Sequence, residues 1–290
     1  MNELPYLVDF DPVIFALGPL KVHWYGVMYL LAFASFWLLA NARSKRSDTP
    51  LNSEQVGDLL FYGMLGVILG GRVGYMLFYA GDQLISNPLN LFKIHTGGMS
   101  FHGGLLGVAI AMAWYARKTK CHFFKLTDFV IPMVPLGLMF GRFGNFIGGE
   151  LWGRVSDVSW AMVFPKAFLN YTPGSEAFMK AYQTGALNEF SRHPSQLYQA
   201  GLEGALLFVV MMWYSRKPRP LMLVSGWFLV GYATFRSVSE FYRQPDAHLG
   251  FVAFDWLSMG MVLCLPMFLC GITLLIIGYT RKQNVSIINA

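Results

Sequence analysis

Residues 141–154 read GRFGNFIGGELWGR and close an apolar run that begins near Phe129. Arg142 lies inside this run, and because a guanidinium in hydrocarbon needs a partner or water, an intramembrane arginine usually marks a functional site. Asn145 follows three residues later and shares a helical face with Arg142. Glycines at 141, 144, 148 and 149 let another backbone or a large ligand approach closely. The stretch predicts a cramped, cationic site that suits a negatively charged head group.

The composition is that of an integral membrane protein. Of the 290 residues, 55% are hydrophobic and only 13% are charged, against roughly a quarter charged in an ordinary soluble domain. The net charge of +6 follows from topology, as shown below, and gives no reason to invoke nucleic acid. The three cysteines have the spacing of neither a zinc site nor a disulfide framework, and no ligand cluster predicts a metal or a cofactor.

Seven apolar stretches are each long enough to cross about 30 Å of hydrocarbon. They predict an all-α membrane protein with spans near residues 23–41, 59–79, 99–116, 128–147, 195–214, 222–242 and 255–279. The chain, residues 1–290, is expected to form a single polytopic domain. An aromatic-rich insertion at about residues 148–194 is expected to form a small head against the outer leaflet.

Basic residues gather in the short loops after the first, third, fifth and seventh spans. Twelve of the 22 lysines and arginines lie there: Arg43, Lys45, Arg46, Arg117, Lys118, Lys120, Lys125, Arg216, Lys217, Arg219, Arg281 and Lys282. The positive-inside rule makes this side cytoplasmic, so the N-terminus is expected outside and the C-terminus inside.

Three intramembrane arginines are expected at one depth. Arg72, Arg142 and Arg236 fall 13 or 14 residues after the expected starts of spans that run outward, which is roughly 20 Å from the cytoplasmic edge. Three cations at one depth indicate a shared anion in the outer half of the bilayer.

A polar stripe ends the sixth span. Tyr232, Arg236, Glu240 and Arg243 are spaced by four, four and three residues, so they share one face of a helix. An Arg236–Glu240 ion pair that only satisfies a buried charge is as good an explanation of this stripe as a catalytic role.

Glycines pair at four-residue spacing in three spans, at Gly66, Gly70 and Gly74, at Gly103 and Gly107, and at Gly137 and Gly141. This spacing permits close helix crossing in lipid and predicts packing only.

The third span opens with GGMSFHGG, residues 97–104. Glycine pairs expose the ring of His102, and histidine exchanges a proton near neutral pH, so His102 is the best candidate for a general base. A polar histidine at the membrane surface with no catalytic role is the alternative.

With these residues in place, the sequence resembles the bacterial prolipoprotein diacylglyceryl transferases. The resemblance runs from about Asp11 to the end of the seventh span and is carried by residues 23–26, 70–72, 97–104, 141–146, 150–154, 192–198, 235–236 and 240–246. Two positions depart from the pattern: the family usually has asparagine at the position of Gly148, and glutamate is common at the position of Gln199.

The resemblance implies a cofactor-free enzyme of the bacterial inner membrane with its active site toward the periplasm. It would transfer the diacylglyceryl group of phosphatidylglycerol to the lipobox cysteine of a prolipoprotein signal peptide. Together with the charge pattern it assigns catalytic roles to His102, Arg142 and Arg236. The expected substrate-binding residues are Tyr25, Arg72, Asn145, Glu150, Gly153, Tyr232, Glu240 and Arg243.

A transporter or flippase for an anionic lipid is the alternative function, because buried arginines would also form its binding site. Transporter folds tend to show two matched halves with broken helices, and seven spans do not divide evenly. A purely structural scaffold would leave the intramembrane arginines and Glu203 unexplained.

Overall fold

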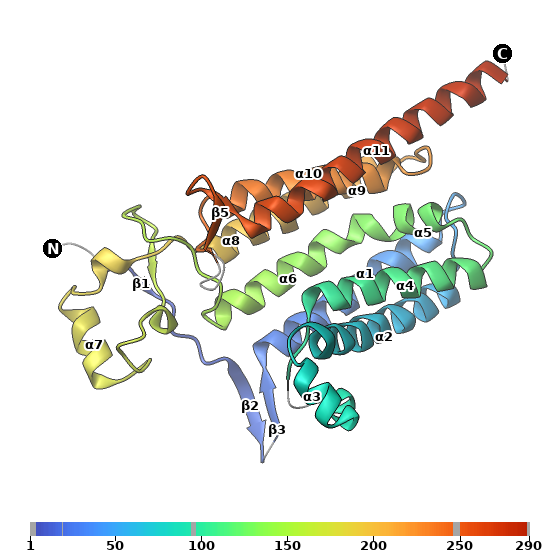
Figure 1. The fold of residues 1–290 in the computed structure, drawn as a ribbon. Helices are drawn as coiled ribbons and strands as arrows, with labels where there is room; N and C mark the ends of the chain where they lie inside the picture. Colours follow the sequence, from blue (N-terminus) through green and yellow to red (C-terminus); the bar gives the residue numbers. More distant parts are fainter. Residues whose placement is uncertain (1–3, 19, 94–96, 246–249, 289–290) are drawn as a thin grey trace. The chain divides into compact units, whose positions relative to one another are not determined.

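The computed structural model describes residues 4–18, 20–93, 97–245 and 250–288, and it is mainly helical (Figure 1). The chain forms two compact units: Met1–Phe36 with Ile131–Ala290, called the first unit below, and Trp37–Val130, called the second unit. Helix α1 (Trp24–Ser44) contributes to both. Asp246, which ends the last family motif, lies outside the described residues, as does the side chain of Lys282.

Within the described residues, five helices are long and apolar enough to cross a membrane: Trp24–Ser44, Ser53–Phe78, Phe123–Ile147, Ser195–Tyr214 and Met259–Arg281. They coincide with five of the expected spans, so the chain is a multi-pass membrane protein. The other two expected spans form α4 (Phe101–Lys118) and α10 (Leu223–Glu240), which are not among the five. The membrane character is confirmed, and the number of seven spans is not.

The second unit contains α2 (Ser53–Phe78), α3 (Gly81–Ser86), the 3-10 helix η1 (Pro88–Phe92), α4 and α5 (Phe123–Val130). Helix α2 begins six residues before the expected start of its span because Asn52 and Gln55 form a capping box. The Asn52 Oδ1 accepts from the Gln55 amide at 2.8 Å, and the Gln55 Oε1 accepts from the Asn52 amide at 3.0 Å.

Glycines bring α2 and α4 into backbone contact. A Cβ added at Gly66 would lie 2.7 Å from the Gly107 carbonyl oxygen, and one added at Gly74 would lie 2.7 Å from the Gly103 Cα. The predicted close crossing is confirmed for these two helices. The same prediction is wrong at Gly141, where an added Cβ would have no described atom within 4 Å.

The first unit begins with a short parallel pairing and a hairpin. Strand β1 (Tyr6–Leu7) pairs with β4 (Met162–Val163), and β2 (Val13–Leu17) pairs antiparallel with β3 (Leu20–His23), which leads into α1. A third sheet joins β5 (Phe251–Ala253) and β6 (Leu257–Ser258). These three two-stranded sheets correct the all-α expectation, because strands of two to five residues leave little periodic signal in a sequence.

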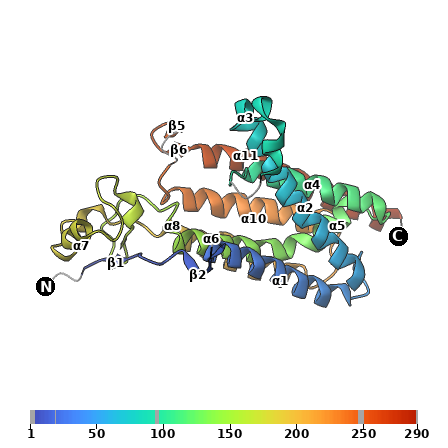
Figure 2. The ribbon, with the colours of Figure 1, turned by 90° about the horizontal axis from the view of Figure 1, so that it is seen from below.

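The helices of the first unit position the charged residues described below. Helix α6 (Val134–Ile147) follows a 3-10 turn at Ile131–Met133. Helix α8 (Ser195–Gln199) continues through a π-helix, η6 (Ala200–Leu206), into α9 (Leu207–Tyr214). Helix α10 lies beside α11 (Met259–Ile288), as Figures 1 and 2 both show.

Residues 148–194 form a small folded head beyond the C-terminal end of α6 (Figures 1 and 2). The head contains β4, the 3-10 helices η4 (Pro165–Ala167) and η5 (Asn188–Phe190), and α7 (Glu176–Gln183). Its core is built on Val163, Phe178 and Leu187, against which Leu7, Phe168, Tyr171, Met179, Ala181 and Tyr182 pack.

We predict that Gly66→Val destabilises the protein by about 1–3 kcal/mol, the usual cost of overpacking. The Gly107 backbone occupies the space that the new side chain needs. The measurement is thermal unfolding in detergent. Gly63→Val is the matched control, because Gly63 lies on the same helix with no described atom within 4 Å of an added Cβ. Equal unfolding temperatures for the two variants would contradict the prediction.

Candidate functional site

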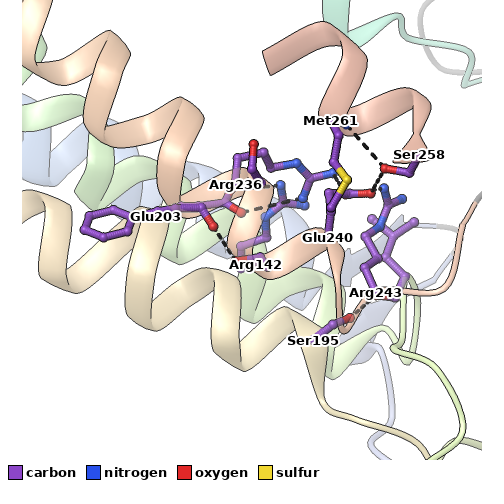
Figure 3. Close-up of polar contacts among 12 residues, drawn as sticks. Arg142, Ser195, Glu203, Arg236, Glu240, Arg243, Ser258 and Met261 are labelled. Carbon is purple, nitrogen blue, oxygen red and sulfur yellow. Dashed lines mark hydrogen bonds and ion pairs between the residues drawn. The ribbon is translucent and has the colours of Figure 1, made fainter. Parts of the chain in front are cut away.

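Five charged side chains of the first unit form one network of ion pairs (Figure 3). The Arg142 Nη2 lies 3.4 Å from the Glu203 Oε2, and the Arg236 Nη1 lies 3.6 Å from the Glu203 Oε1. Arg236 also pairs with Glu240, and the Arg243 Nη1 lies 3.2 Å from the Glu240 Oε1. The structure therefore brings together four residues predicted for the site and adds Glu203.

The network joins three helical segments deep in the protein. Arg142 comes from α6, Glu203 from η6, and Arg236 with Glu240 from α10. The exposed side-chain fraction is 0% for Glu203, 1% for Glu240 and 12% for Arg236. Taking such charges out of water costs several kcal/mol for each ion unless partners compensate. The two carboxylates provide that compensation.

The Glu240 carboxylate is held at the start of α11. The Ser258 Oγ donates to the Glu240 Oε2 at 2.6 Å and accepts from the Met261 amide at 3.3 Å. A Cβ added at Gly260 would lie 2.8 Å from the Glu240 Cδ, so glycine makes room for the carboxylate. The N-terminus of a helix favours negative charge. Sequence reasoning missed Ser258 and Gly260, because neither carries a recognisable motif.

Arg154 fixes the end of α10 from the head side. Its Nε donates to the Arg243 carbonyl at 3.1 Å, and its Nη2 donates to the Glu240 carbonyl at 3.3 Å. The Glu240 carbonyl, at the end of α10, also accepts from the Arg243 amide at 3.3 Å, and the Arg243 carbonyl lies three residues beyond the helix. Arg154 was part of a family motif but had no predicted role, and it positions two members of the network.

Tyr232 lies one turn before Arg236 on α10. Its ring stacks on Phe228, with centroids 5.9 Å apart. Of the expected polar stripe, Tyr232, Arg236 and Glu240 lie on α10, and Arg243 lies three residues beyond its end. A substrate-binding role for Tyr232 stays a prediction.

Tyr25, Asn145 and Glu150 lie around the C-terminal end of α6. A Cβ added at Gly144 would lie 2.7 Å from the Tyr25 Cδ2, so this glycine lets the tyrosine ring rest on the helix. The Asn145 carbonyl accepts from the Glu150 amide at 2.9 Å. The Glu150 carboxylate is exposed and lies 3.8 Å from the Lys166 Nζ of the head. In this structure Glu150 therefore faces the head.

Gly153 is packed between two backbones. Its amide donates to the His193 carbonyl at 2.9 Å, and its carbonyl accepts from the Arg192 Nη1 at 3.2 Å. An added Cβ would lie 2.5 Å from the carbonyl oxygens of both His193 and Tyr242. This close approach requires glycine, and a direct role in substrate binding stays a prediction.

Arg72 belongs to the second unit and is buried, with 5% of its surface exposed. Its Nε donates to the Leu91 carbonyl at 3.2 Å, and its Nη2 donates to the Asn90 carbonyl at 2.6 Å. Its Nη1 donates to the carbonyls of Gly97 and Gly98. Arg72 therefore holds the segment before α4, and its predicted contact with a substrate stays untested.

His102 also belongs to the second unit, on the first turn of α4. Its side chain is exposed, as the flanking glycines predicted, and its ring lies edge-on to Phe101 with centroids 5.7 Å apart. The Ser100 Oγ caps the helix by accepting from the Gly103 amide at 3.2 Å. The ring is accessible for proton exchange, and the general-base role stays a prediction.

A cavity of about 350 Å³ lies in the first unit where the β2–β3 hairpin meets the ends of α1 and α6. It is lined by Phe10, Asp11, Val13, Ile14, Trp24 and Ile147. Its lining includes no member of the ion-pair network. The network is therefore proposed as the site because of its charged side chains, and not because of this cavity. Among the described residues, no three His, Cys, Asp or Glu side chains gather to hold a metal ion.

The fold and the network define a multi-pass membrane protein with a buried cluster of arginines and glutamates. Residues 12–277 match the family described as prolipoprotein diacylglyceryl transferase. The chain belongs to this family, and it is accordingly a transferase.

Relatives named phosphatidylglycerol-prolipoprotein diacylglyceryl transferase are similar over nearly the whole chain. One from Xanthomonas campestris pv. campestris (strain B100) is 53% identical over 283 residues, covering 97% of this chain and 94% of the relative. One from Xanthomonas euvesicatoria pv. vesicatoria (strain 85-10) is 54% identical over 273 residues, covering 93% and 92%.

His193 lies where the head joins the spans. The Trp160 Nε1 donates to the Tyr198 hydroxyl at 2.7 Å, and this hydroxyl lies 3.0 Å from the His193 Nδ1, within hydrogen-bond distance. Burial lowers the pKa of His193, although the Asp157 carboxylate acts in the opposite direction. The folded state therefore binds the proton less readily than the unfolded chain.

We predict that this histidine makes the fold less stable in acid. Above the unfolded pKa of about 6.5, His193 is neutral in both the folded and the unfolded protein. As the pH falls below that value the unfolded chain binds the proton first, so the free energy of unfolding decreases. Unfolding temperatures at pH 7.5 and pH 5.0 should differ less for His193→Gln than for the wild type. His122→Gln, at an exposed histidine, is the control and should keep the wild-type difference. An unchanged difference in His193→Gln would contradict the prediction.

Proposed function

We propose that the protein transfers the diacylglyceryl group of phosphatidylglycerol to the thiol of the lipobox cysteine in prolipoprotein signal peptides. The observation that carries the proposal is the pair of largely buried guanidinium groups, Arg142 and Arg236, which share the buried carboxylate of Glu203. The family and the names of the relatives agree with it. The expected place of action is the bacterial inner membrane, with the active site toward the periplasm.

The proposed reaction is a displacement at the glycerol carbon that carries the phosphate. The sulfur of the acceptor cysteine forms a bond to this carbon, the bond from the carbon to the phosphate oxygen breaks, and the thiol proton passes to a base. The products are a thioether and glycerol phosphate. The thiolate is the reactive form of cysteine, whose free pKa is about 8.5, so a base or a cationic surround favours the attack.

Arg142 and Arg236 are proposed to bind the phosphate and to stabilise its departure. Guanidinium groups form paired hydrogen bonds with phosphate oxygens, and such preorganised donors act strongly in a site that excludes water. Among the described residues, the Arg236 Nη1 is buried without a hydrogen-bond acceptor. This N–H group suits a phosphate oxygen. Asn145, Glu150 and Tyr25 are proposed to hold the glycerol hydroxyls.

His102 is proposed to accept the proton of the acceptor thiol. Its side chain is exposed at the start of a capped helix, which supports access by a substrate. An imidazole exchanges protons efficiently near neutral pH.

We propose seven membrane spans with the N-terminus outside. Helices α4 and α10 have 18 residues each, which gives a length of about 27 Å, close to the roughly 30 Å of the hydrocarbon core. Arg117 and Lys118 end α4 on the side that the positive-inside rule makes cytoplasmic. This topology would place the head at residues 148–194 in the periplasm.

The transfer reaction predicts a defined change in mass. Purified protein in detergent is mixed with phosphatidylglycerol and a synthetic lipobox peptide, and the peptide is analysed by mass spectrometry. The peptide should gain the mass of one diacylglyceryl group, and a peptide with serine in place of the cysteine should gain none. Movement of the lipid without modification of the peptide would instead support a transporter or flippase.

Lysine in place of Arg142 or Arg236 should lower the transfer rate on the order of a hundredfold or more, the usual cost of losing one preorganised donor. Lysine keeps the charge but loses the planar fork that pairs with two oxygens. The matched control is Arg219→Lys, an exposed arginine outside the network, which should keep wild-type turnover. Normal rates in Arg142→Lys or Arg236→Lys would reject a role in phosphate binding.

A further inference from the structure

Glu203 is placed by an unusual helical turn. It lies within the π-helix η6, and its side chain has no exposed surface. Next to it, a Cβ added at Gly204 would lie 2.9 Å from the Met139 Cα, so glycine allows η6 to approach α6 closely. Single π-helical turns occur often at functional sites. This turn carries a carboxylate to two arginines of other helices.

The contacts of Glu203 are loose for a buried carboxylate. Its distances of 3.4 Å to Arg142 and 3.6 Å to Arg236 exceed the roughly 2.7–2.9 Å of a strong charge-assisted hydrogen bond. Within the described residues, neither the Glu203 Oε1 nor the Arg236 Nη1 has a hydrogen-bond partner. Glu240, in contrast, accepts from Ser258 at 2.6 Å. Arg142 and Arg236 thus retain bonding capacity that Glu203 does not use.

The charges of the network do not balance. Arg142, Arg236 and Arg243 carry three positive charges against the two negative charges of Glu203 and Glu240. The excess of one positive charge matches the single negative charge of a phosphodiester. An anion that reached Arg142 and Arg236 would compete with Glu203, because Glu203 is the acidic side chain that faces both guanidinium groups.

We infer that Glu203 is a resident counter-ion, which occupies Arg142 and Arg236 until the phosphate of the lipid donor displaces it. The inference rests on the proposed function for the identity of the anion. Glu203 acts as a positioning residue: its carboxylate offsets the repulsion between the two guanidinium groups and holds both in place while the site is empty. It also weakens the hold on the phosphate product, because its carboxylate competes for the same N–H groups.

The test measures anion binding without catalysis. Glycerol 3-phosphate is titrated into the full-length protein in detergent at pH 7 by calorimetry. Glu203→Gln should bind it about tenfold more tightly, since the variant removes the competing charge in a site of low dielectric constant. Glu203→Asp withdraws the carboxylate by about 1.5 Å, one carbon–carbon bond, and should bind with intermediate affinity.

Two controls separate this role from a structural one. Glu176→Gln makes the same change of charge at an exposed residue of the head and should bind glycerol 3-phosphate as the wild type does. In the transfer assay, Glu203→Gln should lower both the KM for phosphatidylglycerol and kcat, because the donor binds more tightly and the product leaves more slowly. A residue needed only for folding would lower kcat without tightening the affinity for the anion.

Equal or weaker binding of glycerol 3-phosphate by the folded Glu203 variants would overturn the inference. If Glu203→Gln does not fold, Glu203→Asp alone decides the question. The outcome is also distinct from that of the proposed function. If the peptide is not modified but the affinity for glycerol 3-phosphate rises from wild type to Glu203→Asp to Glu203→Gln, the proposed reaction is rejected and the anion site is kept. If the peptide is modified but the affinities do not follow this order, only the counter-ion role of Glu203 is rejected.

Discussion

Burying the guanidinium groups of Arg142 and Arg236 is the constraint on which the charged part of the first unit depends. Each buried ion costs several kcal/mol without a partner, and the partners come from segments distant in the sequence. Glu203 reaches Arg142 on α6 and Arg236 on α10, while Glu240 links α10 to Ser258 at the start of α11. Four helical segments are thereby tied together by the need to neutralise charge.

The same network explains why glycines recur beside it. At Gly260 the carboxylate of Glu240 occupies the space of a side chain, and at Gly204 the backbone of α6 does so. In the second unit, Gly66 and Gly74 lie against the backbone of α4, at Gly107 and Gly103. Glycine spacing alone therefore indicates that another group approaches the helix closely. It does not indicate whether that group is a side chain, as at Gly260, or the backbone of another helix, as at Gly66.

Much of the fold follows from patterns within single segments, and much of the site does not. Apolar runs of sufficient length predicted the helices, and the spacing of Arg236 and Glu240 predicted their pairing within one turn of α10. The sequence showed that Glu203 is an acidic residue inside a span, but it did not identify the partners of Glu203. Periodicity indicates which residues share a face of one helix, and it does not indicate which other helix packs against that face. The π-helix and the contact with Ser258 depend on tertiary packing. Arg72 resembled Arg142 in sequence, yet backbone carbonyls surround it.

The two carboxylates of the network are held with unequal strength, and this difference bears on how the site works. Glu240 has a short bond from Ser258, two arginine partners and the N-terminus of α11 beside it, all of which stabilise its charge. Glu203 has two longer contacts. An anion that enters the network exchanges with the weaker partner and leaves the stronger one in place. Arg236 therefore keeps its orientation through Glu240 while its contact with Glu203 is given up.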